Sequence, residues 1–306
     1  NKKNVAFKYE KMFCFHEIEV DEVESFSYQL FNNSNIPLSK VFEFKSKILI
    51  SKNPKILYFG DHDVDFSGRD ILNRMVLEEV DLVICLGDIT YELTDFQGIK
   101  GDYYFKEMEK LISKIPFIIT PGNHDDADNF KMIGNRFMFL GNKEVDSINM
   151  FSFELSNMLF INYNFNFKVL KSKSRNGSVL DDFDSFIKNA NSNNKKWKFF
   201  NSHIPFYCNF KTKSNAHMCK GKFNVLKDYE KILVGIDINF RVAGHVHLYE
   251  RMSNIENDDT KTDKDKAIFV IGNSTASSLS YTDDAIHINS KSSLANIISK
   301  SGYSIV

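Results

Sequence analysis

The sequence predicts an α/β fold built around parallel strands. From about residue 50 onward, short apolar segments typical of buried strands alternate with segments whose apolar residues recur at helical spacing. Repeated strand–helix–strand units form parallel sheets, because each helix returns the chain to the edge where the strand started. The chain has 306 residues, and 42% of them are apolar, which is enough to bury a large core. We therefore expect one large α/β domain with a shorter segment of different character before it.

The shorter segment comprises residues 1–48. Apolar and polar residues alternate in FCFHEIEV and in KVFEFKSK, and the turn-prone FNNSNIP lies between them, which predicts a few antiparallel strands. So few strands do not form a stable sandwich unaided. We therefore divide the chain into a partial β domain, residues 1–48, and a main domain, residues 49–306.

The main domain contains strands and helices in regular order. In the first helical segment, GRDILNRMVLEEV, Ile71, Leu72 and Met75 fall on one face of a helix. The segment SINMFSFELSNMLFINYN predicts a hairpin, because turn-prone residues at Ser156 and Asn157 separate two apolar runs. In chain order, the other expected strands are 55–60, 81–87, 116–122, 197–203, 238–245 and 267–273, and the expected helices are 68–80, 102–113, 179–190 and 225–235.

Residues able to bind metal ions follow the ends of the predicted strands. Each lies just beyond the carboxyl end of a strand, and an open α/β sheet places its ligand site at that edge. They belong to the segments GDHD, GDITY, PGNHDD, FFNSH and GHVH. In chain order these residues are Asp61, Asp88, Tyr91, Asn123, His124, His203, His245 and His247.

Each of these residues alone has an ordinary structural explanation. Gly-Asp after a strand is commonly a turn or a helix cap, and a single histidine is commonly a hydrogen-bonded structural residue. The joint occurrence of the whole set, in strand order, favours a metal site instead. Carboxylate, imidazole and amide ligands without thiolate suit iron, manganese or zinc. One aspartate that bridges two such ions about 3.5–4 Å apart is the usual clamp for displacement at phosphorus.

Charge and hydropathy restrict the partners of the chain. The net charge is −1, from 39 basic and 40 acidic residues, so no broad basic surface is available and we expect no nucleic-acid partner. No apolar run reaches the roughly 18 residues that would predict a membrane span. The chain begins at Asn1 rather than methionine, and we interpret it as a processed or trimmed product.

Sequons and cysteines suggest the secretory route. Three Asn-x-Ser/Thr triplets are potential glycosylation sites: Asn32, Asn176 and Asn273. Cys208 and Cys219 lie close together in a polar, loop-like stretch, which suits a disulfide in an oxidising compartment. Cys85 lies within the apolar DLVICLG and is expected to be a buried free residue, while Cys14 has no assignment. We therefore expect a secreted protein or one in the lumen of an endomembrane or vacuolar compartment.

Taken together, the motifs resemble those of the purple acid phosphatases, within the calcineurin-like metallophosphoesterases. The resemblance is carried by Asp61, the GDxxY of Asp88 and Tyr91, the GNH of Asn123 and His124, His203, and the GHxH of His245 and His247. It covers roughly residues 10–306 and implies a four-layer α/β/β/α sandwich.

The resemblance extends beyond these motifs. The stretch HEIEVDEVESFSYQLFNNSNIPLSKVFEFKSK is similar to the closing strands of a fibronectin-III-like domain, so residues 1–48 would be a partial appendage of that type. SHIPFYCNF, together with Cys219, resembles a stretch of the family in which two cysteines pair. SSLANIISKSGYSIV resembles the segment before the last strands, which implies that both chain ends are incomplete.

The resemblance also implies a ligand set and a mechanism. Fe(III) would be held by Asp61, Asp88, Tyr91 and His247, and a second divalent ion, Fe, Zn or Mn, would be held by the shared Asp88 with Asn123, His203 and His245. A phenolate on Fe(III) gives the purple charge-transfer band. Metal-bound hydroxide would attack the phosphorus in line, and His124 would position the phosphate and protonate the leaving alkoxide. Activity at acidic pH follows, because a trivalent cation acidifies bound water strongly.

Two positions depart from the family pattern. Asp63 stands where the family usually has glycine, two residues after the first aspartate. In an extended segment its carboxylate would lie on the same side as Asp61 and near the iron; otherwise it would cap the following turn or helix. Thr212 and Lys213 stand where many relatives carry a further histidine, and His217 is the nearest candidate for that role.

From the sequence we expect a dimetal acid phosphatase that hydrolyses small phosphomonoesters. One alternative is a phosphodiesterase or nucleotide hydrolase on the same core. Another is a non-catalytic scaffold that retains the fold. The presence of all seven ligand positions argues against the scaffold, because a structural role does not require Tyr91 and His124 together.

Overall fold

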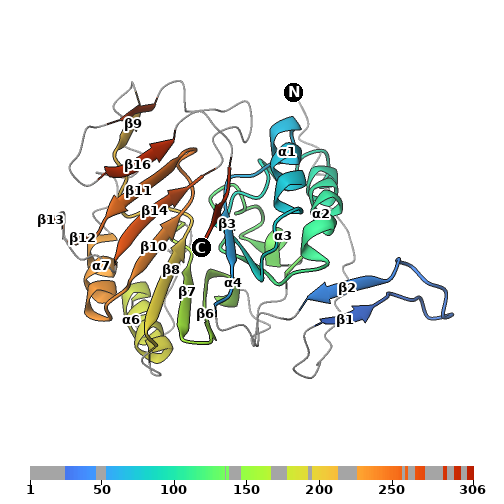
Figure 1. Ribbon diagram of the computed structural model, residues 1–306, viewed down its shortest axis with the longest axis horizontal. Helices are drawn as coiled ribbons and strands as arrows, with labels where there is room; N and C mark the ends of the chain where they lie inside the picture. The colour runs from blue at the N-terminus through green and yellow to red at the C-terminus, as the bar shows by residue number, and fades with distance from the viewer. Residues whose placement is uncertain are drawn as a thin grey trace, which may run out of the picture.

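Two β-sheets face each other, and helices cover their outer sides (Figure 1). The computed structural model describes residues 25–45, 53–134, 136–137, 146–166, 178–191, 195–212, 226–256, 259–260, 266–272, 285–287, 293–297 and 302–306. Within these ranges, every helix is too short or too polar to cross a membrane.

The smaller sheet has four strands in the order β17, β3, β4, β5. Strands β3, β4 and β5 are parallel, and β17 runs antiparallel beside β3. The bounds are Ile56–Phe59 (β3), Leu82–Cys85 (β4), Phe117–Ile119 (β5) and Ser304–Ile305 (β17). Every side chain of β3 and β4 is buried, as the continuous apolar sequences ILYF and LVIC predict for strands covered on both faces.

The larger sheet has seven strands in the order β16, β11, β14, β10, β8, β7, β6. Its central strands β14, β10, β8 and β7 are parallel, and the outer strands β6, β11 and β16 pair antiparallel with their neighbours. The bounds are Met150–Leu155 (β6), Met158–Tyr163 (β7), Trp197–Ser202 (β8), Phe240–Ala243 (β10), Tyr249–Ser253 (β11), Ala267–Ile271 (β14) and Ser293–Ile297 (β16).

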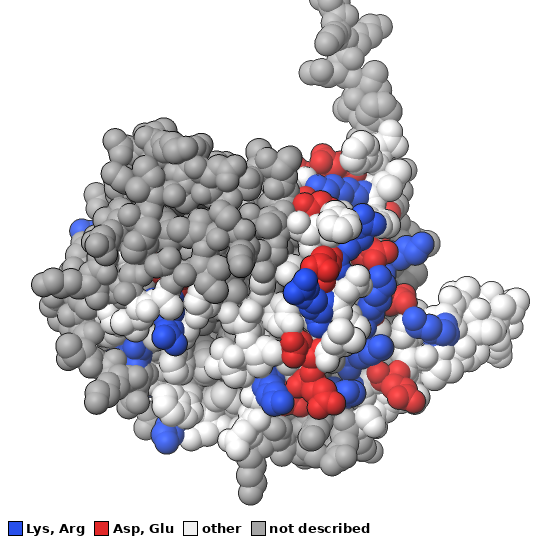
Figure 2. Space-filling model, turned by 45° about the horizontal axis from the view of Figure 1, so that its top comes forward, with Lys and Arg blue, Asp and Glu red and all other residues white. Residues whose placement is uncertain are grey.

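Helices form the two outer layers. On the smaller sheet lie α1 (Phe66–Met75) and α2 (Ile99–Ile112), and on the larger sheet lie α6 (Val179–Ala190) and α7 (Leu226–Gly235); α3 (Lys131–Gly134) and α4 (Asp146–Asn149) are short. On the face drawn in Figure 2, basic and acidic side chains lie interspersed on the side that carries α1 and α2. Exposed pairs of this kind add little stability, because water screens them.

Apolar packing confirms the four-layer α/β/β/α architecture. Leu57 and Phe59 of β3 pack with α1 and α2 in one cluster, whereas Ile56 and Tyr58 pack in another cluster between the two sheets. A third cluster joins α6 and α7 to the larger sheet. This alternation follows from the period of two in a strand, which sends successive side chains to opposite faces.

The sequence predicted the parallel strands but did not divide them between two sheets, and it missed β11. This strand inserts antiparallel between β14 and β16. Its sequence, YERMS, carries two charged residues that hide the strand pattern. Glu250 is nevertheless buried, because both of its oxygens accept hydrogen bonds from Asn209, at 2.9 and 2.8 Å, while Arg251 is exposed.

The helix ends follow capping more closely than apolar periodicity. The pattern predicted a helix over 68–80, but α1 begins at Phe66, where Asp65 caps it by accepting from the Gly68 amide at 2.7 Å. It ends at Met75, and Leu77 is 81% exposed, so the later apolar residues do not continue a helical face. Helix α6 has the predicted bounds and starts with a capping box.

The amino-terminal part contains a small antiparallel sheet of β1 (Ser25–Tyr28) and β2 (Phe42–Lys45), drawn apart from the two main sheets in Figure 1. Rings stack across it, and the Tyr28 hydroxyl donates to the Ser113 carbonyl at 3.1 Å, at the end of α2. The division at residue 48 stays a prediction. Two further small sheets pair β9 (Phe210–Thr212) with β15 (Ala285–His287) and β12 (Ile255–Glu256) with β13 (Asp259–Thr260).

Candidate metal centre

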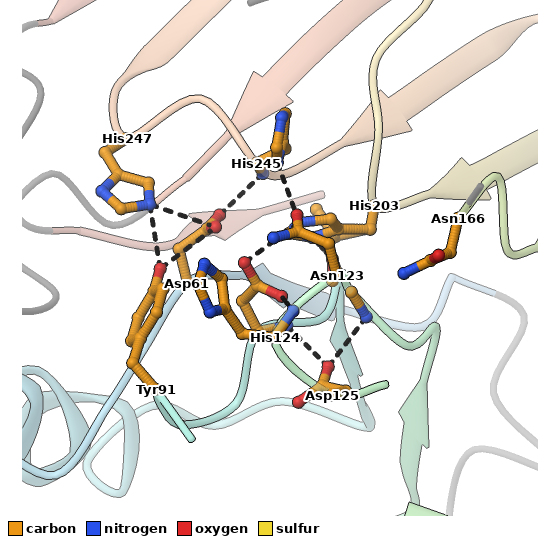
Figure 3. Close-up of polar contacts among 12 residues, drawn as sticks. Asp61, Tyr91, Asn123, His124, Asp125, Asn166, His203, His245 and His247 are labelled. Carbon is orange, nitrogen blue, oxygen red and sulfur yellow. Dashed lines mark hydrogen bonds and ion pairs between the residues drawn. The ribbon is translucent and has the colours of Figure 1, made fainter. Parts of the chain in front are cut away.

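Loops from both sheets meet at one site. The loops after β3, β4 and β5 of the smaller sheet face those after β8 and β10 of the larger sheet, and their side chains point toward one another (Figure 3). The structure thus brings together the residues that the sequence placed at strand ends: Asp61, Asp88, Tyr91, Asn123, His124, His203, His245 and His247.

The first half of the site contains Asp61, Tyr91 and His247. The Tyr91 hydroxyl lies 2.9 Å from His247 Nε2 and 3.4 Å from Asp61 Oδ1, and His247 Nε2 lies 3.4 Å from the same carboxylate oxygen. All three side chains are buried. A phenol, an imidazole and a carboxylate therefore present donor atoms to one small volume.

The second half is centred on His203. Its Nε2 lies 3.2 Å from Asp88 Oδ2, 3.1 Å from Asn123 Oδ1 and 3.2 Å from His245 Nδ1. A single N–H cannot donate to three atoms at once, so this convergence is better suited to a cation than to hydrogen bonding. Donor atoms of Asp88, His203 and His245 all lie within 4.8 Å of one another, as metal ligands do.

The charges of this half are tightly balanced. Burial raises the pKa of Asp88, but the imidazoles of His203 and its neighbours outweigh it and bring the pKa to about 2. Burial alone would lower the pKa of His203, but the Asp88 carboxylate and other neighbouring groups together have the larger opposite effect, and the pKa is raised to about 9. Burial and the nearby His203 lower the pKa of His245 to about 4. Without a metal, a proton on His203 offsets Asp88, and a bound cation would displace that proton.

The protein surroundings of Tyr91 favour its neutral phenol. Burial raises its pKa, and the carboxylates of Asp61 and Asp88 raise it further. A phenolate at this position therefore requires a nearby cation. Among the described residues, only histidines form ion pairs with Asp61 and Asp88, so the donor set and the buried charge both fit a metal centre.

Two glycines let the backbone approach the carboxylates. A Cβ atom on Gly122 would lie 2.1 Å from Asp88 Oδ1, and one on Gly244 would lie 2.9 Å from Asp61 Oδ2. Both distances are shorter than any real Cβ contact. These are the glycines of the segments PGNH and AGHVH. The two motifs therefore supply both the ligand candidates and the side-chain-free positions that the neighbouring carboxylates require.

The sequence was compared with models of known protein families. Residues 54–249 match the family described as calcineurin-like phosphoesterase. The chain belongs to the calcineurin-like phosphoesterases.

Within this family, the phosphoesterase is a homologue of the purple acid phosphatases. Human acid phosphatase type 7 is 24% identical to it over 225 residues, 67% of this chain and 49% of that protein. Purple acid phosphatase 15 of Arabidopsis thaliana is 22% identical over 260 residues, 75% of this chain and 47% of that protein. The purple acid phosphatase from yellow lupin seeds has the same fold, with a TM-score of 0.67 at 14% identity, over 92% of this chain and 54% of that chain. The phosphoesterase spans about half the length of the curated relatives it matches.

Sequence reasoning missed Asp125, which connects two ligand loops of this phosphoesterase through main-chain hydrogen bonds. Its buried carboxylate accepts hydrogen bonds from the amides of Asp88 at 2.8 Å, Ile89 at 3.2 Å and Gly122 at 2.8 Å (Figure 3). Burial raises its pKa, with a further contribution from Asp88, to about 7. Its place directly after GNH was the available signal, but only the fold shows that it ties two ligand loops together.

Glu92 was also missed. Its Oε1 lies 2.8 Å from Nδ1 of His124, and both side chains are partly exposed. An ionised carboxylate can accept hydrogen bonds but cannot donate them. Nδ1 of His124 therefore carries the proton in this contact, and Nε2 is the nitrogen left for a substrate. Glu92 directly follows Tyr91, yet nothing in GDITYE predicts that it turns toward another loop.

Asp63 does not adopt the expected extended geometry, and of the expected capping it makes only the hydrogen bond from the following Val64 amide, at 2.7 Å. Asp61 and Asp63 have φ values of 55° and 57°, so the segment is not extended and the two carboxylates do not share a side. The cap of α1 is Asp65 instead. The carboxylate of Asp63 pairs with Lys100 of α2 at 3.1 Å, a partner that lies 37 residues away in the sequence.

The remaining residues expected from the sequence have no described contact with the metal centre. His217, Cys219, Asn176 and Asn273 lie outside the described residues, so the pairing of Cys208 with Cys219 stays a prediction. Asn32 lies in the turn between β1 and β2, where its Oδ1 accepts from the amides of Ser34 and Ile36. Glycosylation there also stays a prediction. Cys85 is buried and free, as expected.

His62, between the two aspartates of GDHD, points into the core rather than into the site. It is 2% exposed and packs edge-on against the rings of Phe59 and Tyr104, at 5.3 and 5.7 Å between ring centres. Within the described chain, neither ring nitrogen has a hydrogen-bond partner. Burial therefore lowers the pKa of His62 from 6.5 to about 4.

We expect the variant His62→Phe to lose less stability in acid than the wild type. A buried neutral histidine stabilises the fold fully above its unfolded pKa and loses that contribution as pH falls to the folded pKa. The window runs from pH 6.5 down to about 4, and the difference corresponds to roughly 3 kcal/mol. Urea unfolding of both proteins at each end of this window measures it. Equal losses in the two proteins would contradict the assignment.

Proposed function

We propose that this phosphoesterase is a dimetal phosphatase that hydrolyses small phosphomonoesters under acidic conditions. The observation that carries the proposal is the convergence of two buried carboxylates, three imidazoles, an amide and a phenol from five loops. The homology to acid phosphatases supports the reaction class.

The residues would divide between two ions, with Asp88 contributing to both sets. Fe(III) would be held by Asp61, Asp88, Tyr91 and His247, and a second divalent ion, Fe, Zn or Mn, by Asp88, Asn123, His203 and His245. The phenol supports iron, because its oxygen becomes a strong ligand only when a highly charged cation displaces its proton. When bound, the pair of ions would supply an activated water molecule and neutralise charge on the phosphate oxygens.

His124 would act on the substrate rather than on a metal. Asn123 already offers an oxygen from the same turn, and the His124 ring contacts Glu92 and Tyr91 instead of the ligand carboxylates Asp61 and Asp88. With Nδ1 held by Glu92, a protonated Nε2 can donate to the leaving alkoxide as the P–O bond breaks. The main-chain amide of His124 donates to Asp88 Oδ1 at 2.8 Å, which fixes the imidazole relative to the shared ligand.

Turnover of a chromogenic phosphomonoester and of the matching diester, with metal analysis of the same sample, tests the proposal. We expect two metal equivalents including iron, and faster turnover of the monoester. Faster turnover of the diester or of nucleotides would favour the alternative hydrolase. A protein without metal or turnover would be a scaffold that retains the fold.

Substitution of Tyr91 tests the identity of the first metal. We expect Tyr91→Phe to retain iron and to lose the visible band, because phenylalanine fills the same space without an oxygen ligand. Absorption spectra and iron analysis of the two proteins measure this. An unchanged spectrum in the variant would contradict the role of Tyr91.

We also place the protein in an oxidising compartment, secreted or luminal. The predicted pairing of Cys208 with Cys219 would fit this assignment, and closing so short a loop would contribute on the order of 2–3 kcal/mol. Mass spectrometry of the native protein tests it, and two free thiols at these positions would exclude the pairing.

A further inference from the structure

Asp63 and Lys100 form an ion pair in contact with the loop that carries Asp88 and Tyr91. The Lys100 ammonium lies 3.1 Å from Asp63 Oδ2, and the two side chains are only 17% and 7% exposed. Two pairs on the neighbouring helices are more exposed. The side chains of Arg74 and Asp70 on α1 are 66% and 52% exposed, and that of Lys110 on α2 is 50% exposed.

The pair joins three segments that build the site. Asp63 belongs to the loop after β3, which also carries the ligand candidate Asp61, and its Oδ1 accepts from the Thr90 hydroxyl at 3.0 Å. Lys100 lies in the first turn of α2 and donates a second hydrogen bond, to the main-chain carbonyl of Tyr91. The charged pair therefore holds two consecutive residues of the loop after β4.

Main-chain hydrogen bonds already run between these two loops, and the pair extends them. The amides of Asp61, His62 and Asp63 donate to the carbonyls of Gly87, Asp88 and Ile89, at 2.9, 3.1 and 3.1 Å. These three bonds involve residues 87–89 of the second loop and do not include Tyr91. The Tyr91 carbonyl accepts instead from the Lys100 ammonium.

We infer that Asp63 and Lys100 are positioning residues that hold Tyr91 in place as a metal ligand. This inference rests on the proposed function. The phenol of Tyr91 must meet His247 and Asp61 within 2.9 and 3.4 Å, and its main chain is anchored through Lys100. Asp63 neutralises that lysine and aims it, because its other oxygen is fixed by Thr90 and by the amide of Val64 at 2.7 Å.

A buried pair has a stability signature that differs from the effect expected on the position of Tyr91. Removing one partner leaves the other charge buried and uncompensated, whereas removing both partners together is far better tolerated. The single variants are therefore expected to be less stable than the double variant. Asparagine is the suitable replacement for Asp63, because it is among the few residue types that tolerate its positive φ.

The experiment compares the wild type with Asp63→Asn, Lys100→Met and the double variant, each loaded with iron. We expect Lys100→Met to keep its iron, to shift and weaken the visible band, and to lower kcat by about 10- to 100-fold, as a ligand displaced by a fraction of an ångström would. Asp63→Asn should change in the same direction. The thermal midpoint of the double variant should lie closer to that of the wild type than the midpoint of either single variant does, but its band and kcat should stay altered, because it too lacks the hydrogen bond from Lys100 to the Tyr91 carbonyl. Lys110→Met, an exposed lysine of the same helix, is the matched control and should leave band and kcat unchanged.

Two results would overturn the inference. One is a set of variants with lower thermal midpoints but the wild-type band, which would make the pair merely structural. The other is a crystal structure of Lys100→Met in which the Tyr91 hydroxyl remains 2.9 Å from His247 Nε2. That structural test holds even without metal. A wild type that takes up no iron would refute the proposed function instead, and the position of Tyr91 in the crystal would still decide the role of Lys100.

Discussion

The variant His124→Ala is expected to lower kcat for a phosphomonoester by about 10²–10⁴-fold, the range typical of a lost acid–base group. Its metal content should not change, because the His124 ring contacts Glu92 and Tyr91 rather than the ligand carboxylates. The loss should be smaller for a substrate whose leaving group is a good one, since such a group departs without protonation. Steady-state kinetics with two leaving groups and metal analysis measure both effects.

Glu92 provides an internal check on this role. Glu92→Gln removes the carboxylate that holds Nδ1 at 2.8 Å, so it should lower kcat by less than His124→Ala does. The double variant should be no worse than His124→Ala alone, because Glu92 acts through the imidazole. Loss of a metal equivalent from His124→Ala, or independent losses in the double variant, would contradict the assignment.

The second large effect is expected from Gly122→Ala. The added methyl group would lie 2.1 Å from Asp88 Oδ1 and 2.6 Å from the Asp88 amide, so the loops after β4 and β5 must separate. Overpacking of this kind costs about 1–3 kcal/mol of stability. Displacing the shared ligand by about 1 Å would lower kcat by roughly 100-fold. We therefore expect a protein that folds but binds less of the second metal and is nearly inactive.

Gly134→Ala is the matched control for this substitution. Gly134 ends α3, and a Cβ atom at that position would have no neighbour within 4 Å. The control should retain the metal content, activity and thermal midpoint of the wild type. Wild-type metal content and kcat in Gly122→Ala would show that the loops can separate without consequence, contrary to the close packing around Asp88.

The sequence alone determined the strands and helices that carry the site. Continuous apolar runs such as ILYF and LVIC mark strands buried on both faces, and the bounds of α6 follow from its apolar stripe and from the Ser178 cap. These signals are local, because each depends on a few neighbouring residues. For the same reason the sequence placed every ligand candidate just after a strand.

The tertiary structure decided how these elements meet. It divided the parallel strands between two sheets through the apolar contacts that Ile56 and Tyr58 make across the interior, and it buried Glu250 in an unpredicted strand by pairing it with Asn209. Neither contact leaves a periodic signal, because the partners are far apart in the chain.

The supporting residues of the site show the same limit. Asp125, Glu92 and Lys100 act on ligand candidates from other loops, and no spacing in the sequence encodes such pairs. Asp63 shows the reason most directly. Extended geometry would have turned it toward Asp61, but a positive φ at both residues rotates its carboxylate to Lys100. The sequence determined which chemical groups follow each strand, whereas the backbone conformation of the assembled loops decided which of those groups face one another.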